Sequence, residues 1–306
     1  MPLVSRRRFI SILAGLPILA GASSLRAEPN TFFRWHGIAL GAEAEIWLDH
    51  PQAAEITDRA AAEIARLEAI FSLNRSDSAL ARLNAQGRLD APPFELLECL
   101  GLSGRIHSAT SGLFDPTVQP LWALYARSHA EGHSPQPADL SRALQLVNWS
   151  GTKFDETAIQ LSPGAALTLN GIAQGYIADR IADFLRAQGL SDVLVNTGEY
   201  RALGAMPDGQ PWPVRLAAGG TVELVGRALA SSSPLGTTFD PEGRIGHILN
   251  PTTGLPAPSR WRNVSISSSS AALADGLSTA ACLMLDRSSI DAALENFAEV
   301  RLENLS

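Results

Sequence analysis

Hydrophobic positions recur along the chain with two different periods. In the stretch ALGAEAEIWL the apolar residues alternate through Ala42, Ala44, Ile46 and Leu48, and a period of two predicts a strand. In residues 53–71 the apolar residues instead recur at helical spacing, which predicts a long amphipathic helix. A second helix is expected within 91–112, where paired prolines suit a first turn and one face stays apolar.

Beyond residue 150 the pattern mixes short strands with helices. The expected elements are a hairpin at 152–163, a strand, turn and helix at 167–189, a strand, glycine turn and strand at 191–205, further strands at 213–231, an irregular segment at 246–259, a strand at 263–270 and a helix at 271–285. No strict βαβ alternation, repeat or linker is visible. We therefore expect a mixed α+β fold of two lobes that share one core, with sheets packed against helices.

The first 27 residues have the pattern of an export signal. Three arginines, Arg6–Arg8, precede an uncharged apolar stretch that runs from Phe9 to Leu25, and small-residue exits lie at Ala20-Gly21-Ala22 and at Ala27. This pattern predicts a twin-arginine-type signal peptide at 1–27, a mature domain at 28–306 and a periplasmic location. An uncleaved membrane anchor is the alternative, but the stretch is short for a span and contains Pro17. No span is expected in the mature chain.

Charge narrows the possible partners. Without residues 1–27 the chain would keep 20 basic side chains against 31 acidic ones, and its one lysine is Lys153. This balance excludes nucleic acid as an expected partner, and any phosphate ligand would need backbone amides or a metal ion. The two cysteines, Cys99 and Cys282, lie in apolar surroundings and are expected to be buried free thiols, with one disulfide as the alternative.

The stretch LTLNGIAQGYIADRI, at 167–181, combines an apolar segment with a turn and a helix start. Such a start offers free backbone amides to a phosphate. The spacing of Gly171 and Gly175 is nevertheless neither the dinucleotide fingerprint nor a P-loop. Taken alone, this turn fits tight packing better than nucleotide binding.

Three further segments carry candidate chemistry. In ADGLSTAA, the residues Asp275, Ser278 and Thr279 share one face of the expected helix, so their oxygens can converge on a hard cation; simple helix capping by Asp275 is the alternative. His247 borders the irregular loop GHILNPTTGLPA. Asp115, in GLFDPTVQPLW, lies between apolar residues, where a carboxylate needs a partner.

Together these segments resemble the FAD:protein FMN transferases along nearly the whole mature chain. The matching blocks, in order, are FSLNRSDSALARLN (71–84), GLFDPTVQPLW (112–122), LTLNGIAQGYIADRI (167–181), VNTGEYRALG (195–204), GHILNPTTGLPA (246–257) and ADGLSTAA (274–281). Six blocks in the right order are a far more specific signal than any one block. By this resemblance, the turn at Gly171 holds a nucleotide.

The resemblance implies a set of site residues. Mg²⁺ would be bound by the carbonyl of Gly171 and by Asp275 and Thr279, with Ser278 adjacent. His247 or Asp275 would transfer the proton, and the pattern does not separate the two. The expected contacts to FAD are Leu40, Asn74, Phe114, Asp115, Thr168 and Gln174.

The implied activity is Mg²⁺-dependent transfer of the FMN half of FAD to a Thr or Ser hydroxyl of an exported acceptor protein, with release of AMP. Several positions depart from the pattern of the resemblance: Thr168 for Asp, Gln174 for Lys or Glu, Asn250 for Asp, Glu199 after a single glycine in place of Gly-Asp, and Asn74 where an aromatic residue is common. These departures leave two other interpretations open. One is an FAD pyrophosphatase that releases FMN and AMP, and the other is a non-catalytic periplasmic flavin carrier.

Overall fold

A computed structural model describes residues 32–306 of the chain. The expected signal peptide at 1–27 lies outside these residues, as does the start of the expected mature domain. Within the described part, none of the helices combines the length and apolar character needed to cross a bilayer.

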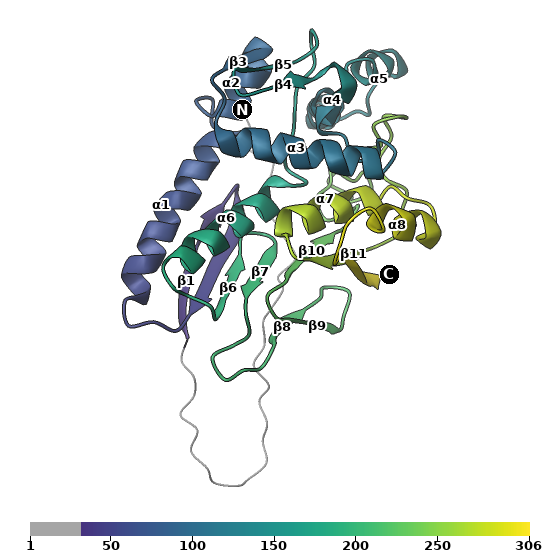
Figure 1. The fold of residues 1–306 in the computed structure, drawn as a ribbon. Helices are drawn as coiled ribbons and strands as arrows, with labels where there is room; N and C mark the ends of the chain where they lie inside the picture. The colour runs from purple at the N-terminus through teal and green to yellow at the C-terminus, as the bar shows by residue number, and fades with distance from the viewer. Residues whose placement is uncertain (1–31) are drawn as a thin grey trace.

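A seven-stranded antiparallel sheet is the largest element of the fold (Figure 1). Its strand order is β1-β2-β6-β7-β10-β11-β12. The strands are β1 (Phe33–Ala39), β2 (Ala42–Leu48), β6 (Val193–Asn196), β7 (Tyr200–Leu203), β10 (Ala228–Ser232), β11 (Val264–Ser268) and β12 (Arg301–Leu305). Short connections join β1 to β2 and β6 to β7, so these pairs are hairpins.

Three helices cover one face of this sheet: α1 (Ala53–Phe71), α6 (Ala173–Ala187) and α7 (Ala271–Ala281). Their buried positions follow the helical spacing of the sequence; in α1 they include Ile56, Ala60, Ile64 and Leu67. The opposite face packs on a small hairpin of β8 (Trp212–Arg215) and β9 (Thr221–Leu224), around the fully buried Trp212. Helix α8 (Arg287–Leu294) precedes β12.

A second lobe lies above the sheet in Figure 1, and α3 (Phe94–Ala109) runs across the boundary. This lobe contains α2 (Ala79–Gln86), α4 (Gln119–Ala130), α5 (Pro137–Leu144), two 3-10 turns, η1 (Pro116–Val118) and η2 (Trp149–Gly151), and a three-stranded sheet of β3 (Arg88–Asp90), β5 (Ala158–Gln160) and β4 (Lys153–Phe154). One continuous hydrophobic core includes residues of both lobes, such as Ile46 of β2 and Leu80 of α2. The expected two-lobed α+β fold with a shared core is thus confirmed.

Most expected elements lie where the pattern placed them, but one is wrong. The apolar stretch before Gly171 forms no strand, because its backbone pairs with a side chain instead of a neighbouring strand. The side-chain amide of Asn84 donates to the Leu167 carbonyl (2.8 Å) and accepts from the Leu167 N–H (2.7 Å). The next N–H, that of Thr168, donates to the Pro116 carbonyl (2.8 Å). This segment is therefore anchored to the second lobe, through α2 and η1.

Candidate active site

A cavity of about 850 Å³ lies at the junction of the lobes. This volume is within the range of ligand pockets in proteins. Its walls come from β1 and β2, the segment before α4, the irregular segment that leads into α6, the β6–β7 turn, the residues after β10, and α7. Five of the six motif blocks contribute at least one residue to these walls; the block at 71–84 contributes none.

The turn at Gly171 meets the face of α7 that carries Thr279. A Cβ atom placed on Gly171 would lie 3.0 Å from Thr279 Oγ1 and 3.1 Å from its methyl carbon. Glycine therefore suits the close approach of this backbone to α7, since any side chain here would press on Thr279. Both residues line the cavity, as the expected metal site needs.

Gly175 lies where α6 packs against α7. A Cβ atom there would lie 2.3 Å from the Ala271 carbonyl oxygen and 2.7 Å from the Ala272 nitrogen, so α6 and α7 approach backbone to backbone. This approach brings the Gly175 N–H within 3.2 Å of Asp275 Oδ2. The two glycines of the block at 167–181 thus bring the turn and α6 against the face of α7 that carries Asp275 and Thr279.

Asp179, one turn further along α6, binds the start of α7. Its carboxylate accepts hydrogen bonds from the N–H groups of Ala271 (2.9 Å) and Ala272 (3.0 Å) and from the Ser270 hydroxyl (2.8 Å). Ser270 is the N-cap of α7, with its hydroxyl 3.2 Å from the Leu273 nitrogen. The caps of α7 are therefore Ser270 and Asp179, which excludes the capping interpretation of Asp275.

Asp275 is a buried carboxylate that lines the cavity. Only 3% of its surface is exposed, and burial raises its pKa to about 7, an effect that the Gly175 N–H partly offsets. A second carboxylate, Glu199, is close by and 8% exposed. Burial, followed by the charge of Asp275, raises the pKa of Glu199 well above its usual value. Two buried acids without a basic partner are an arrangement that a cation relieves.

Ser278 is placed beneath the cavity wall and forms no part of its lining. Its hydroxyl donates to the Asp275 carbonyl (3.0 Å) and shares a hydrogen bond with the Ser232 hydroxyl (2.7 Å), which also lies 3.4 Å from Thr279 Oγ1. These bonds connect the end of β10 to α7. Ser278 thus orients the residues around it, and its expected part in metal binding stays a prediction.

Among residues 32–306, no three His, Cys, Asp or Glu side chains converge into a metal-binding group. The expected ligand set is of a different kind: the carboxylate of Asp275, the hydroxyl of Thr279 and the carbonyl of Gly171. All three donors are oxygens in one cavity wall, which suits a hard cation such as Mg²⁺. The unneutralised buried carboxylates support the same assignment.

His247 lines the same cavity from the irregular segment after β10. Its ring nitrogen Nδ1 lies 3.0 Å from the Thr237 carbonyl, which also accepts from the His247 N–H (3.1 Å). This contact fixes the ring and places a proton on Nδ1, which leaves Nε2 with the lone pair. Burial lowers the pKa of His247, and the carbonyls of Thr237 and Pro234 offset part of this effect.

Asn250 shapes the loop that follows His247. Its side-chain oxygen accepts hydrogen bonds from the N–H of Thr252 (2.8 Å), the hydroxyl of Thr252 (2.7 Å) and the N–H of Thr253 (3.1 Å). An amide oxygen serves here as well as a carboxylate, since all three partners are donors. In the same way, Thr168 Oγ1 accepts from the Asn170 N–H (3.3 Å). These two departures from the motif pattern therefore preserve local hydrogen bonding.

Four of the six residues expected to contact FAD line the cavity: Phe114, Asp115, Thr168 and Gln174. Asp115 also has a structural role, because its carboxylate accepts from the Thr117 N–H (2.8 Å) and hydroxyl (2.5 Å) and so caps η1. Leu40 and Asn74 lie outside the cavity lining. Leu40 is in the β1–β2 turn beside the lining residue Gly41, and Asn74 is exposed between α1 and α2. Their contact with FAD stays a prediction.

The cavity lining also includes residues that the sequence did not single out as site residues, among them Trp122, Arg34 and Glu199. Trp122, from α4, packs edge-on against Phe239 with ring centroids 5.3 Å apart. Arg34 lies at the rim and pairs with Glu45. Glu199 was visible in the sequence only as a departure from the motif. A tryptophan within the motif block 112–122 was the available signal for the first of these.

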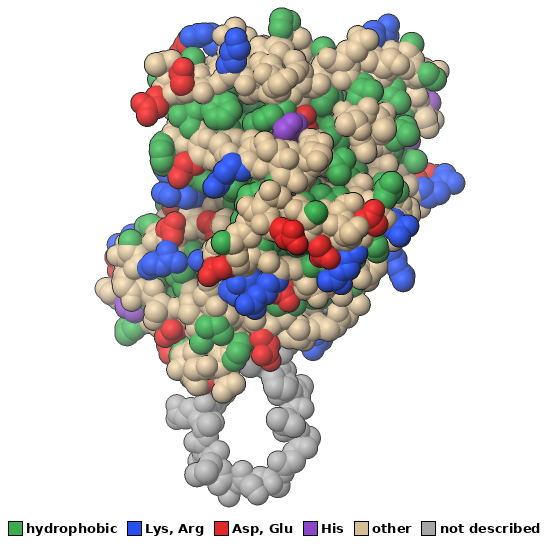
Figure 2. Space-filling model, turned by 45° about the vertical axis from the view of Figure 1, so that its right-hand side comes forward, with side chains coloured by type: hydrophobic (Ala, Val, Ile, Leu, Met, Phe, Trp, Pro, Cys, Tyr) green, Lys and Arg blue, Asp and Glu red, His purple; other side chains and the backbone are tan. Residues whose placement is uncertain are grey.

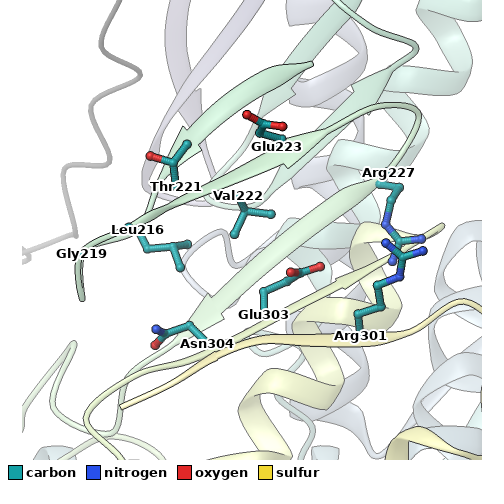
Figure 3. A pocket seen from close by; sticks show the side chains of 10 residues that line it. Leu216, Gly219, Thr221, Val222, Glu223, Arg227, Arg301, Glu303 and Asn304 are labelled. Carbon is teal, nitrogen blue, oxygen red and sulfur yellow. The ribbon is translucent and has the colours of Figure 1, made fainter. Parts of the chain in front are cut away.

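A second hollow, of about 440 Å³, lies between the β8–β9 hairpin and β12. Figure 3 shows Arg227 and Arg301 side by side there, with Glu303 next to them. Arg227 is tied to the Ser267 hydroxyl (2.9 Å) and the Glu299 carbonyl (2.7 Å). None of the motif blocks lines this hollow. The face drawn in Figure 2 carries acidic and basic side chains intermixed.

Cys99 and Cys282 are free and buried, as expected. Burial raises the pKa of both thiols, that of Cys282 to about 12. Thiols of this kind are unreactive and pack as small hydrophobic groups.

Comparison with known proteins agrees with this fold and site. The ApbE family model matches residues 40–301, and the chain therefore belongs to the ApbE family. It is 29% identical to an FAD:protein FMN transferase of Klebsiella pneumoniae (strain 342) over 78% of each chain. It is also 29% identical to an FAD:protein FMN transferase of Vibrio cholerae serotype O1, over 91% of this chain and 88% of that one.

Among solved structures, the chain is similar to the apo form of the Pseudomonas stutzeri flavinyl transferase ApbE. The TM-score is 0.78 with 27% identity, over 89% of this chain and 90% of that chain.

Proposed function

We propose that this protein is an FAD:protein FMN transferase, which uses Mg²⁺ to move the FMN moiety of FAD onto a Thr or Ser hydroxyl of an acceptor protein. The observation that carries the proposal is the approach of the Gly171 turn to Thr279, in the cavity that Asp275 also lines. Membership of the ApbE family and the names of the relatives support the same activity.

The reaction is a phosphoryl-type transfer between oxygens. The acceptor hydroxyl oxygen forms a bond to the phosphorus of the FMN half, the bond between that phosphorus and the bridging oxygen breaks, and AMP leaves with the bridging oxygen. Catalysis of such a transfer depends mainly on alignment and on charge neutralisation. Mg²⁺ held by Asp275, Thr279 and the Gly171 carbonyl would neutralise pyrophosphate charge.

The residues of this chain divide the remaining tasks. His247 Nε2 carries a lone pair at neutral pH and accepts the proton of the acceptor hydroxyl. Phe114, Thr168 and Gln174 form the walls that position FAD, and Trp122 offers an aromatic face. Cationic side chains in the lining are limited, within the described chain, to Arg34 at the rim. A metal ion held by Asp275, Thr279 and the Gly171 carbonyl would therefore supply most of the charge compensation.

The proposal also includes export of the protein to the periplasm. The arginines of 6–8 and the apolar stretch that follows support twin-arginine export to the periplasm, where exported acceptor proteins are found. An acceptor threonine or serine on a flexible segment would enter the cavity from the solvent side.

The proposal is tested by incubating the purified protein with FAD and Mg²⁺, with and without an acceptor whose target segment begins with Asp-Gly and ends with Ala-Thr. We expect covalent flavin fluorescence on the acceptor and AMP in equal amount. Asp275→Ala should abolish labelling, whereas the control Asp183→Asn, an exposed acid on the same helix as Gly175, should not.

Other outcomes would replace the proposal. Free FMN in the absence of an acceptor would identify a pyrophosphatase. Intact FAD in a tight complex, with no AMP, would identify a flavin carrier. Full labelling by the Asp275→Ala variant would remove Asp275 from the site.

A further inference from the structure

The β6–β7 turn brings a second acidic side chain to the cavity wall that carries Asp275. Gly198, at φ +104°, makes this turn, and Thr197 ties it to α6 by donating its hydroxyl to the Gln174 carbonyl (2.9 Å). Glu199 follows Gly198 and directly precedes β7. Its side chain is 8% exposed and lines the cavity.

One carboxylate oxygen of Glu199 is satisfied by the protein. The Ser231 N–H donates to Glu199 Oε2 at 3.1 Å, which fixes the side chain beside the end of β10. The next residue, Ser232, is bonded to Ser278 and lies 3.4 Å from Thr279 Oγ1. Glu199 is therefore held against the same part of α7 that carries the expected metal ligands.

No basic side chain neutralises this pair of acids. In the described chain, Glu199 and Asp275 interact with each other, with the backbone amides of Ser231 and Gly175, and with two acidic groups, the Tyr200 phenol beside Glu199 and the Cys99 thiol beside Asp275. Gln174, whose amide group packs against Gly198, stands where the motif pattern of the flavin transferases has Lys or Glu, and it carries no charge. Arg34 pairs with Glu45 at the rim.

Two buried carboxylates with one amide each are costly unless a cation joins them. Oxygen donors from two acids, a hydroxyl and a carbonyl match the preferences of Mg²⁺.

We propose that Glu199 is an additional ligand of the divalent cation, and that its charge lets this protein bind Mg²⁺ before FAD arrives. The inference rests on the proposed function, because it concerns the same metal site. It predicts an ion-loaded resting enzyme in which the site is set before the pyrophosphate enters.

The test is Mg²⁺ titration of the FAD-free protein by calorimetry, with Mn²⁺ and its electron paramagnetic resonance signal as a second probe. Glu199→Gln keeps the size of the side chain and removes its charge. We expect it to weaken Mg²⁺ binding by at least about tenfold. Glu43→Gln removes the same charge from an exposed residue of the cavity rim and should change the affinity less than about twofold, because water screens that charge.

Thermal unfolding gives a readout that needs no turnover. In EDTA, Glu199→Gln should have a higher melting temperature than the wild type, because a buried charge is gone. On addition of Mg²⁺, the melting temperature of Glu199→Gln should rise by less than that of the wild type. If Glu199→Gln fails to fold, Glu199→Asp tests the same point. The shorter side chain keeps the charge but moves the carboxylate oxygens away from the cation, so Glu199→Asp should also bind Mg²⁺ more weakly.

The two hypotheses fail in different ways. Unchanged Mg²⁺ affinity in Glu199→Gln, together with lost affinity in Asp275→Asn, would overturn the role of Glu199 and leave the transferase proposal intact. If Glu199→Gln binds Mg²⁺ more weakly than the wild type but the wild type labels no acceptor, the result would support Glu199 as a ligand and refute the proposed function.

Discussion

The N–H of Gly175 lies 3.2 Å from Asp275 Oδ2, so the first turn of α6 holds the carboxylate of α7 in place. The bond joins residues that are 100 positions apart in the chain. It exists because Gly175 has no side chain and lets the two helices touch. The close packing of α6 on α7 therefore also fixes the position of Asp275, the expected metal ligand.

Gly175→Ala should therefore affect both stability and the site. The added methyl group would meet the backbone of Ala271 and Ala272, which cannot move as a flexible side chain would. We expect a loss of about 1–3 kcal/mol in the free energy of unfolding, typical of overpacking. Mg²⁺ affinity should fall as well. Gly189→Ala is less useful as a control because of its positive φ, whereas Gly101→Ala, on α3 in open space, isolates the packing effect. Equal stability of the two variants in urea unfolding would contradict this account.

Asp179 should be important for stability, and through stability for activity. Removing its carboxylate in Asp179→Ala leaves two N–H groups at the start of α7 without a partner. The expected loss is about 2–3 kcal/mol, as for other hydrogen bonds to charged groups. Asp179→Asn keeps one acceptor oxygen and should lose less. Chemical denaturation of both variants measures the difference, and a neutral effect of Asp179→Ala would show that Ser270 alone caps the helix.

His247 should set the acidic limit of the reaction. Because burial lowers its pKa below 6.5, the neutral ring that accepts a proton persists to lower pH than for an exposed histidine. At saturating Mg²⁺, which keeps Asp275 ionised, kcat/KM should fall only as the pH drops below 6.5. His247→Asn should slow transfer at all pH values, abolish this limb and leave FAD binding in place. If FAD binding collapses with activity, His247 is structural and Asp275 becomes the candidate base.

Removal of the metal should separate binding from chemistry. With EDTA present we expect no flavin transfer, and the addition of Mg²⁺ in excess should restore it. The apo protein should also be less stable to heat than the Mg²⁺-loaded one, since a ligand that binds only the folded state stabilises it. Undiminished labelling of the acceptor in EDTA would exclude a metal-dependent reaction.

Trp122 should contribute to the binding of FAD. It lines the cavity and is supported by Phe239, so its ring is held in position. Loss of an aromatic stacking surface typically costs about 1–3 kcal/mol per ring that stacks on it. Trp122→Ala should therefore weaken FAD binding by about tenfold or more in a fluorescence titration, and Trp122→Phe should retain most of the affinity. Equal affinities in all three proteins would place the flavin and adenine elsewhere in the cavity.

Local patterns were sufficient for many of the elements. The spacing of apolar residues at 53–71 predicted α1 with its bounds, since a helix long enough to bury one face shows its period in the sequence. The hairpin of β6 and β7 was equally visible, because Gly198 marks its turn. The stretch before Gly171 was misread as a strand. Its hydrogen-bond partner is the side chain of Asn84, which lies 83 residues earlier, and no local pattern reveals such a partner.

In the expected site, too, some residues were predicted from the sequence and others were decided by tertiary contacts. Motif order placed Gly171, Thr168, Gln174, His247, Asp275 and Thr279 together, and all of them line one cavity. Leu40 and Asn74 came from the same resemblance but lie outside its lining. Ser278 shares the helix with Asp275 and Thr279, yet its hydroxyl is used by Ser232. Helical spacing fixes which residues share a face, but the neighbouring strand decides which of them reaches the cavity.

The sequence by itself determined the α+β composition, the principal helices and the residues with chemical capacity, because these depend on contacts within a few turns of chain. Only the tertiary structure decided that Gly175 touches Asp275 and that Glu199 stands beside it without a basic partner. Those relationships arise where α6, α7 and the β6–β7 turn pack together, and the free energy of burying a charge depends on everything that surrounds it.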